Sequence, residues 1–168
     1  GLNASLTPLF RAGFFGVSES ADSTSAVQGA INRLSAGGRL DISSMIMING
    51  ELSINSDDTT VSGTGRGTGF TTTSATGNLL QIESSGPTTT TIFRTGVSDL
   101  EIKSTVEKTS GALLKVTEAA YNTFSNISLQ NGFIGFHGLG LRASEIDNIH
   151  IRSGQLWSGI KTGSRFML

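Results

Sequence analysis

The chain has 168 residues, with 12 Lys and Arg against 13 Asp and Glu, and this near-neutral balance argues against nucleic acid as a partner. Hydrophobic residues make up 36% of the chain, and no run approaches the roughly 20 apolar residues of a bilayer helix, so we expect neither disorder nor membrane insertion. Cysteine is absent and only two histidines occur, which excludes a disulfide framework and argues against a metal site. The 22 glycines fit many short strands separated by turns.

The N-terminal part divides into two segments. Residues 1–21 carry scattered apolar side chains without a regular period, and we interpret them as a lead-in segment that packs on the rest. Between residues 22 and 37 the apolar residues recur at helical spacing, Asp22 or Ser23 is suited to cap the free amides, and Gly37-Gly38 is suited to end the segment. The apolar positions are Ala26, Val27, Ala30, Ile31 and Leu34. This pattern predicts one amphipathic helix within 22–37.

A repeated pattern governs the chain from residue 38 to 168. Three segments begin with Asn or Asp, continue with two apolar residues in alternation, and end in polar residues: Asp99–Ser104, Asn126–Asn131 and Asn148–Ser153. A second set of short apolar segments lies between them: Leu80–Ile82, Leu114–Val116, Ile134–Phe136 and Trp157–Ile160. A period of roughly 20 to 35 residues is typical of a solenoid, and here it predicts two strands in each turn.

Stacking these turns would bury the alternating apolar residues in one continuous column, with Leu100, Ile127 and Ile149 as neighbours. A single turn cannot bury its own apolar side, whereas each added turn also covers its neighbour. The sequence therefore predicts an all-β fold, a right-handed single-stranded parallel β-helix over 38–168 that continues in further rungs. The helix within 22–37 would cap its first turn, since uncovered strand edges invite association.

The N-terminal half resembles the start of the pectate-lyase-like β-helix superfamily, especially bacteriophage tailspikes and related tail proteins. The resemblance rests on Phe15–Val17, on the helical segment Asp22–Ile31, on the strand Gly37–Ile42, and on Glu51–Gly65 as a first full turn. The chain departs from the family at Ser43-Ser44, where a Pro-Gly turn is common. The pattern is specific for the fold rather than for an activity.

The resemblance implies a virion protein of the phage tail that forms a homotrimer, contacts other tail proteins and binds bacterial surface polysaccharide. It leaves open whether the full-length protein also depolymerises that polysaccharide, as a glycoside hydrolase or a polysaccharide lyase. No cofactor is implied, and we assign no catalytic residue. The alternatives are a secreted enzyme similar to pectate lyase or polygalacturonase, and a purely structural β-helical component of the virion.

Candidate carbohydrate contacts lie on the outward positions of the repeated strands. Alternation places Glu101, Ser128 and His150 in one polar column and Lys103, Gln130 and Arg152 in the next. We therefore predict carbohydrate contacts at Glu101, Lys103, His150 and Arg152, and at Trp157, whose ring is suited to a sugar or to a subunit contact. Glu101 lacks a second acid on its face, so a solvated ladder of charge pairs is favoured over an inverting glycosidase pair.

Three further motifs are interpreted as structural. In Gly63–Gly69 the glycines occupy every second position, which gives no G-x-G-x-x-G register, so the segment predicts a turn between rungs rather than a nucleotide site. Glu145 and Asp147 precede Asn148 and are interpreted as turn residues. His137 is expected at the end of a strand, with no metal role.

Overall fold

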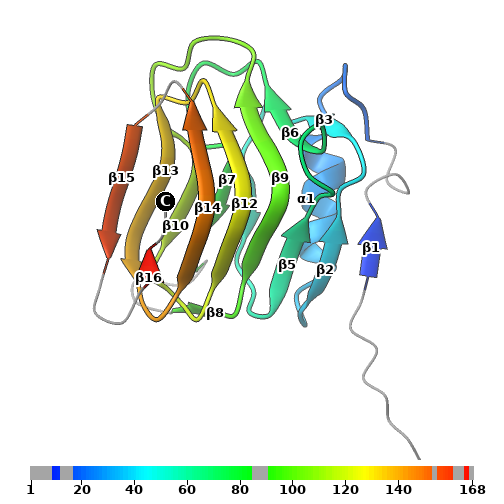
Figure 1. Ribbon diagram of the computed structural model, residues 1–168. Helices are drawn as coiled ribbons and strands as arrows, with labels where there is room; N and C mark the ends of the chain where they lie inside the picture. Colours follow the sequence, from blue (N-terminus) through cyan, green and yellow to red (C-terminus); the bar gives the residue numbers. More distant parts are fainter. Residues whose placement is uncertain (1–8, 12–16, 85–90, 153–154, 161–164, 167–168) are drawn as a thin grey trace, which may run out of the picture.

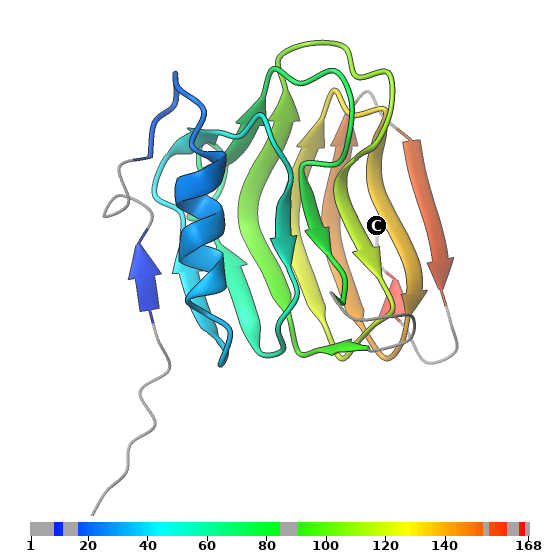
Figure 2. The same cartoon turned by 180° about the vertical axis from the view of Figure 1, so that it is seen from behind.

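The computed structural model describes residues 9–11, 17–84, 91–152, 155–160 and 165–166. It is a right-handed parallel β-helix with one helix at its N-terminal end (Figure 1). The strands of the near sheet rise, the chain crosses the top, and it descends in the sheet behind (Figures 1 and 2). Each return places the next strand farther from the helix (Figure 1). The coil is therefore right-handed, as expected for connections between parallel strands.

Three parallel sheets make up the walls. The first contains β1 (Leu9–Arg11), β2 (Gly38–Asp41), β5 (Thr59–Ser62), β9 (Gly96–Ser104), β12 (Thr123–Gln130), β14 (Glu145–Arg152) and β16 (Arg165–Phe166) in spatial order, with β3 (Met45–Met47) beside β6 (Gly69–Thr72). The second contains β4 (Leu52–Ile54), β7 (Leu80–Ile82), β10 (Ala112–Thr117), β13 (Ile134–Leu141) and β15 (Gln155–Ile160). The third pairs β8 (Ile92–Phe93) with β11 (Ala119–Ala120).

The core has the register that the first repeat predicts. Ile127 pairs with Leu100 on one side and with Ile149 on the other, and all three side chains are buried. The outward columns also agree, because Ser128 lies between Glu101 and His150, and Gln130 lies between Lys103 and Arg152. The period-two alternation was sufficient here because each strand has one face on the core.

The second repeat is shifted at one strand. Leu80 pairs with Leu114, but Leu114 pairs with Phe136 rather than with Ile134, so the three short segments do not align by their first residues. Gly138 consequently faces Val116. A Cβ atom at Gly138 would lie 2.7 Å from Leu141 Cδ1 and 3.0 Å from Phe136 Cε1, so larger neighbours fill the space that this glycine leaves.

The helix α1 (Thr24–Asn32) lies within the predicted 22–37, and it buries Val27, Ala30 and Ile31. Asp22 is the capping candidate that binds a helix amide: its Oδ1 accepts hydrogen bonds from Thr24 N at 3.1 Å and from Asn49 N at 3.0 Å. Together with the bond from the Thr24 hydroxyl, which is the main cause, these bonds lower the pKa of Asp22. No helix in the described ranges is long and apolar enough to cross a bilayer.

The helix also covers a sheet edge. β4 is the first strand of the second sheet, and the Gln28 side chain bonds to its backbone: Oε1 accepts from Ser53 N at 2.8 Å, and Nε2 donates to Ser53 O at 2.9 Å. The side-chain amide thus replaces the neighbouring strand that β4 lacks. Figure 2 shows α1 at this end of the stack.

Candidate functional site

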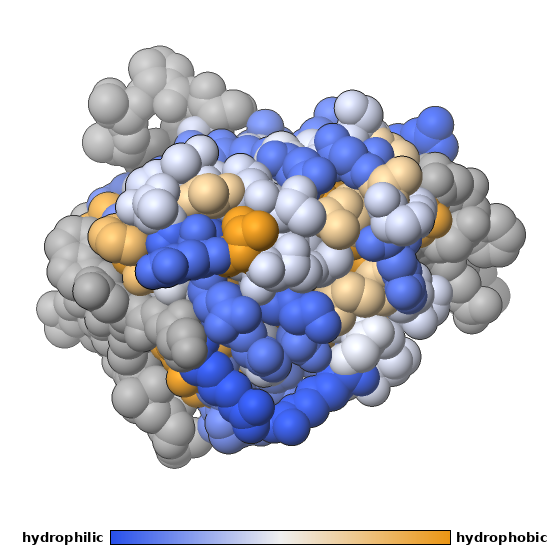
Figure 3. Space-filling view, turned by 90° about the horizontal axis from the view of Figure 1, so that it is seen from above, coloured by the Kyte–Doolittle hydropathy of each residue, from blue (hydrophilic) through white to orange (hydrophobic). Residues whose placement is uncertain are grey.

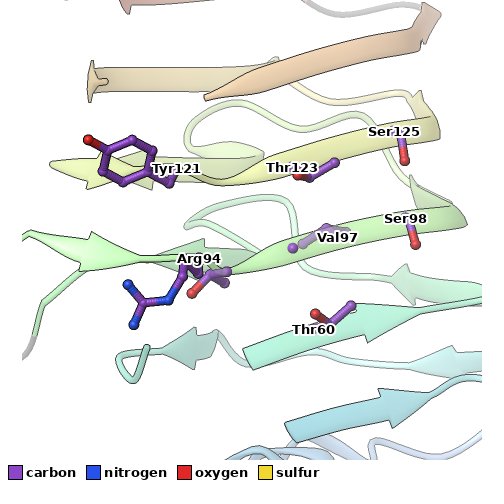
Figure 4. A pocket seen from close by; sticks show the side chains of 9 residues that line it. Thr60, Arg94, Val97, Ser98, Tyr121, Thr123 and Ser125 are labelled. Atoms are coloured by element: carbon purple, nitrogen blue, oxygen red, sulfur yellow. The ribbon is translucent and has the colours of Figure 1, made fainter. Parts of the chain in front are cut away.

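A shallow pocket of about 310 Å³ opens on the outer face of the first sheet, over β5, β9 and β12 (Figure 4). Its wall contains both polar and apolar surface. Its lining residues are Thr60, Arg94, Thr95, Gly96, Val97, Ser98, Tyr121, Thr123 and Ser125.

The pocket exists because Gly96 has no side chain. Gly96 pairs with Thr60 on one side and with Thr123 on the other, so it interrupts a row of outward threonines. A Cβ atom at Gly96 would lie 3.4 Å from Thr123 O and 3.5 Å from Thr60 Oγ1, which are ordinary contacts. A larger residue would therefore fit the strand and fill the pocket floor.

A corner of the β-helix positions the ring at one end of this pocket. Asp58, Arg94, Tyr121 and Ala143 follow one another along this corner in left-handed conformations, with φ angles of 56°, 55°, 57° and 45°. The bend turns the Tyr121 side chain outward, and it is 63% exposed. Its ring stacks on Phe93, with a centroid distance of 6.4 Å and an interplanar angle of 23°. The ring is therefore accessible yet held in place.

Arg94 forms a two-point ion pair at the same corner. Its Nε lies 2.6 Å from Asp58 Oδ1 and its Nη2 lies 2.9 Å from Asp58 Oδ2. Hydrogen bonding to Arg94 lowers the pKa of Asp58, and the same contact raises the pKa of Arg94. The pair is neutral overall, and the guanidinium keeps further N–H donors. The pocket thus combines an aromatic face, hydroxyl groups and donors with little net charge.

A second pocket, of about 260 Å³, lies where the long strands of the first sheet bend. Asp99, Asn126 and Asn148 occupy this bend with φ angles of 53°, 54° and 52°. Asn126 Nδ2 donates to Asp99 Oδ1 at 2.9 Å and Asn148 Nδ2 donates to Asn126 Oδ1 at 2.7 Å, which makes a side-chain ladder along the helix axis. The pocket is lined by Gly65, Arg66, Leu100, Asn126, Ile127, Ser128, Asn148 and His150.

The predicted contact residues do not all gather in one place. His150 lines the second pocket, whereas Glu101 is only 7% exposed beside it. Glu101 Oε1 accepts a hydrogen bond from Gln130 Nε2 at 3.0 Å and lies 3.6 Å from Lys103 Nζ. Lys103 and Arg152 lie in the next outward column and line neither pocket.

Trp157 belongs to another sheet. It pairs with His137 in β13, so its strand β15 lies in the second sheet rather than beside the predicted columns. Its side chain falls outside the described residues. The predicted contact residues do not include Tyr121, Arg94, Gly96 or Arg66. Left-handed corner residues interrupt the period-two alternation, so no pattern in the sequence indicates that Tyr121 is exposed.

Three structural interpretations need correction. Glu145 and Asp147 lie within strand β14, opposite Thr123 and Ser125, and not in a turn. His137 lies inside β13 rather than at a strand end, and burial, followed by the nearby Lys115 charge, lowers its pKa. Residues 63–68 connect β5 and β6 of the same turn and not successive rungs. Across the described residues, no group of three or more His, Asp or Glu side chains is placed to hold a metal.

No protein-family model matches the chain, and no curated protein matches it. Solved structures do. ORF18 of Geobacillus virus E2 is 12% identical with a TM-score of 0.72, over 94% of this chain and 39% of that protein. The tailspike protein of Acinetobacter phage vB_ApiP_P1 is 13% identical with a TM-score of 0.65, over 92% of this chain and 28% of that one.

A third similar structure comes from a bacterium. A candidate glycosyl hydrolase from Parabacteroides merdae is 11% identical with a TM-score of 0.66, over 88% of this chain and 75% of that protein. At these identities the three likenesses show the fold, a parallel β-helix found both in phage proteins and in a hydrolase-like protein. The chain spans well under half the length of the two phage proteins.

Proposed function

We propose that this chain is a β-helical part of a phage tailspike-like protein and that it binds bacterial surface polysaccharide in the Gly96 pocket. The proposal includes a place in the virion, a homotrimer and contacts to other tail proteins. Two of the three similar structures are phage proteins, and one of them is a tailspike, which supports this choice among β-helical functions.

The pocket itself carries the proposal. A sugar presents an apolar C–H face and a rim of hydroxyls, and aromatic rings with a polar edge suit such ligands. Tyr121 supplies an exposed ring that Phe93 supports, and Thr60, Thr123 and Ser125 supply hydroxyls that donate and accept. The Arg94–Asp58 ion pair adds N–H donors. Because the pair is neutral overall, it suits an uncharged sugar at this pocket.

Substitution of Gly96 by Thr tests the proposal directly. The new side chain would fill the pocket floor while giving the strand a residue that strands favour, so the fold should be retained. We expect the parent chain to bind at least one member of a panel of purified O-antigens and capsular polysaccharides by isothermal titration calorimetry. Gly96→Thr should weaken that binding at least about tenfold, a change of about 1.4 kcal/mol, without lowering the melting temperature.

A second substitution, Tyr121→Ala, tests the aromatic contact, and Phe133→Ala is its matched control. Tyr121→Ala should weaken binding as well, whereas Phe133→Ala removes another exposed ring, 45% accessible, outside both pockets. Phe133 follows β12 on the loops that join the first sheet to the second, a face on which polar residues predominate (Figure 3). Unchanged affinity in Gly96→Thr, or failure of the parent chain to bind any polysaccharide of the panel, would contradict the proposal.

Polysaccharide cleavage is the second candidate function, and one observation favours it. Glu145 and Asp147 lie two residues apart on the outer face of β14, opposite Thr123 and Ser125 of the pocket. Such positions are separated by about 7 Å along a strand, near the spacing of an inverting carboxylate pair. Release of oligosaccharides that is lost in both Glu145→Gln and Asp147→Asn would support it, and binding without release would leave the chain as an adhesin.

A further inference from the structure

The second pocket has a different chemistry from the Gly96 pocket. Arg66, on the connection between β5 and β6, lines one side, and His150 of β14 lines another. Asn126, Asn148 and Ser128 complete its polar wall. It therefore collects residues from four turns of the β-helix, and Arg66 and His150 are separated in the sequence by half the length of the chain.

Arg66 is an exposed cation without an ion-pair partner within the described ranges. By contrast, Arg94 is paired with Asp58 at the Tyr121 corner, and Arg142 lies 3.2 Å from Glu118. A guanidinium presents five N–H donors in a fixed plane that matches a carboxylate at two points. Arg66 thus offers this pocket a complete set of donors.

The ladder adds donors that its own hydrogen bonds do not use. A primary amide has two N–H groups, and one of them is used at Asn126 and one at Asn148. Ser128 Oγ accepts a bond from Gln130 Nε2 at 3.2 Å, so the hydroxyl hydrogen of Ser128 is available to another acceptor. The wall of the pocket is consequently rich in donors.

The neighbouring carboxylates are already engaged. Asp99 accepts from Asn126, and Glu101 accepts from Gln130 beside Lys103. Neither carboxylate lines the pocket. An acceptor that entered would therefore meet free N–H and O–H groups and the unpaired guanidinium before it met a negative charge.

We propose that this pocket binds the carboxylate of an acidic sugar, so that the polysaccharide recognised here contains uronic-acid-type residues. The inference rests on the proposed function, since it names a charged unit of the same ligand. Arg66 donates two hydrogen bonds to the carboxylate, and the amide N–H groups of Asn126 and Asn148 donate to hydroxyl oxygens of the sugar. The Gly96 pocket, with its neutral ion pair, takes an uncharged sugar of the same chain.

Nuclear magnetic resonance with two matched monosaccharides tests this assignment. Methyl glucuronoside and methyl glucoside share one ring and differ only in a carboxylate against a hydroxymethyl group, and methyl galacturonoside with methyl galactoside repeats the comparison for a second ring. We expect at least one uronoside, and neither neutral glycoside, to shift the side-chain NH2 signals of Asn126 and Asn148 saturably. Arg66→Gln should weaken this binding about tenfold, the loss expected for a hydrogen bond to a charged group.

Arg39→Gln is the matched control, because it removes the same charge from an exposed position on β2 that lines neither pocket and is not a predicted contact. It should leave the uronoside titration unchanged. Sodium sulfate is titrated in parallel, and equal shifts with sulfate would reduce the site to an adventitious ion only and overturn the proposal. Equal shifts from the neutral glycosides, or no shift from either uronoside, would also overturn it.

The outcomes separate this inference from the proposed function. If a neutral glycoside shifts the Tyr121 signals while the uronosides leave Asn126 and Asn148 unchanged, the Gly96 pocket binds sugar and the acidic subsite is wrong. If neither pocket responds and no polysaccharide of the panel binds, both proposals fail.

Discussion

The turn that contains β5 and β6 and the later turns that contain β9, β12 and β14 cross the same corner in different ways. In the earlier turn residues 63–68 leave the sheet as a loop, whereas in the later turns a single left-handed residue bends a continuous strand. Both arms of the earlier turn still pair with β9, as Ser62 does with Ser98 and Gly69 with Glu101. Register is therefore set on the arms, and the loop at the corner carries side chains such as Arg66 without affecting it.

The largest expected effect is on the free energy of unfolding, and it contrasts a core position beside the Asn ladder with a position on the loop at the same corner. Ile127→Asp would place a charge at a fully buried position between Leu100 and Ile149, and we expect it to lower the free energy of unfolding by more than about 4 kcal/mol. Thr64→Asp, the same new residue on the exposed loop, should change it by less than about 0.5 kcal/mol. Urea denaturation measures both, and similar values for the two would contradict the assigned register.

An intermediate effect concerns the anchoring of the loop. Gly69 has a φ of 137°, and a Cβ atom there would collide with the Glu101 carbonyl of β9, so Gly69→Ala should cost about 3 kcal/mol. Gly65 also has a positive φ, 112°, but faces open space, so Gly65→Ala should cost only about 1 to 2 kcal/mol. Thermal unfolding of the two variants distinguishes them. If Gly65→Ala were the more harmful, the loop would be constrained at its tip rather than at its end.

The smallest effect concerns the ladder itself. Asn126→Ala removes two side-chain hydrogen bonds and places a residue with a Cβ but no polar group at a φ of 54°, which should cost about 2 kcal/mol in stability. Asn126→Gly removes the same bonds but tolerates the conformation, so we expect about 1 kcal/mol. Chemical denaturation of both variants separates the cost of the lost hydrogen bonds from the cost of the left-handed backbone conformation. An equal cost would show that the backbone conformation contributes nothing here.

Periodicity predicted most of the fold and only part of the candidate sites. It placed Leu100, Ile127 and Ile149 correctly because a strand with one buried face must alternate. It did not indicate the register of 134–136, where Gly138 and its larger neighbours Phe136 and Leu141 share the core volume. It also missed Tyr121, since one left-handed residue is enough to redirect a side chain.

The amino-acid sequence by itself determined the stacked strands, the helix that closes the first turn and the order of the outward columns, because these follow from local spacing and the burial of apolar residues. Only the tertiary structure decided which distant residues share a pocket. Gly96 leaves a pocket because threonines of the two adjacent turns flank it, and Arg66 and His150 line one pocket because the β-helix brings several turns to one corner. Such neighbours depend on the lengths of the connecting loops, which vary without changing the repeat.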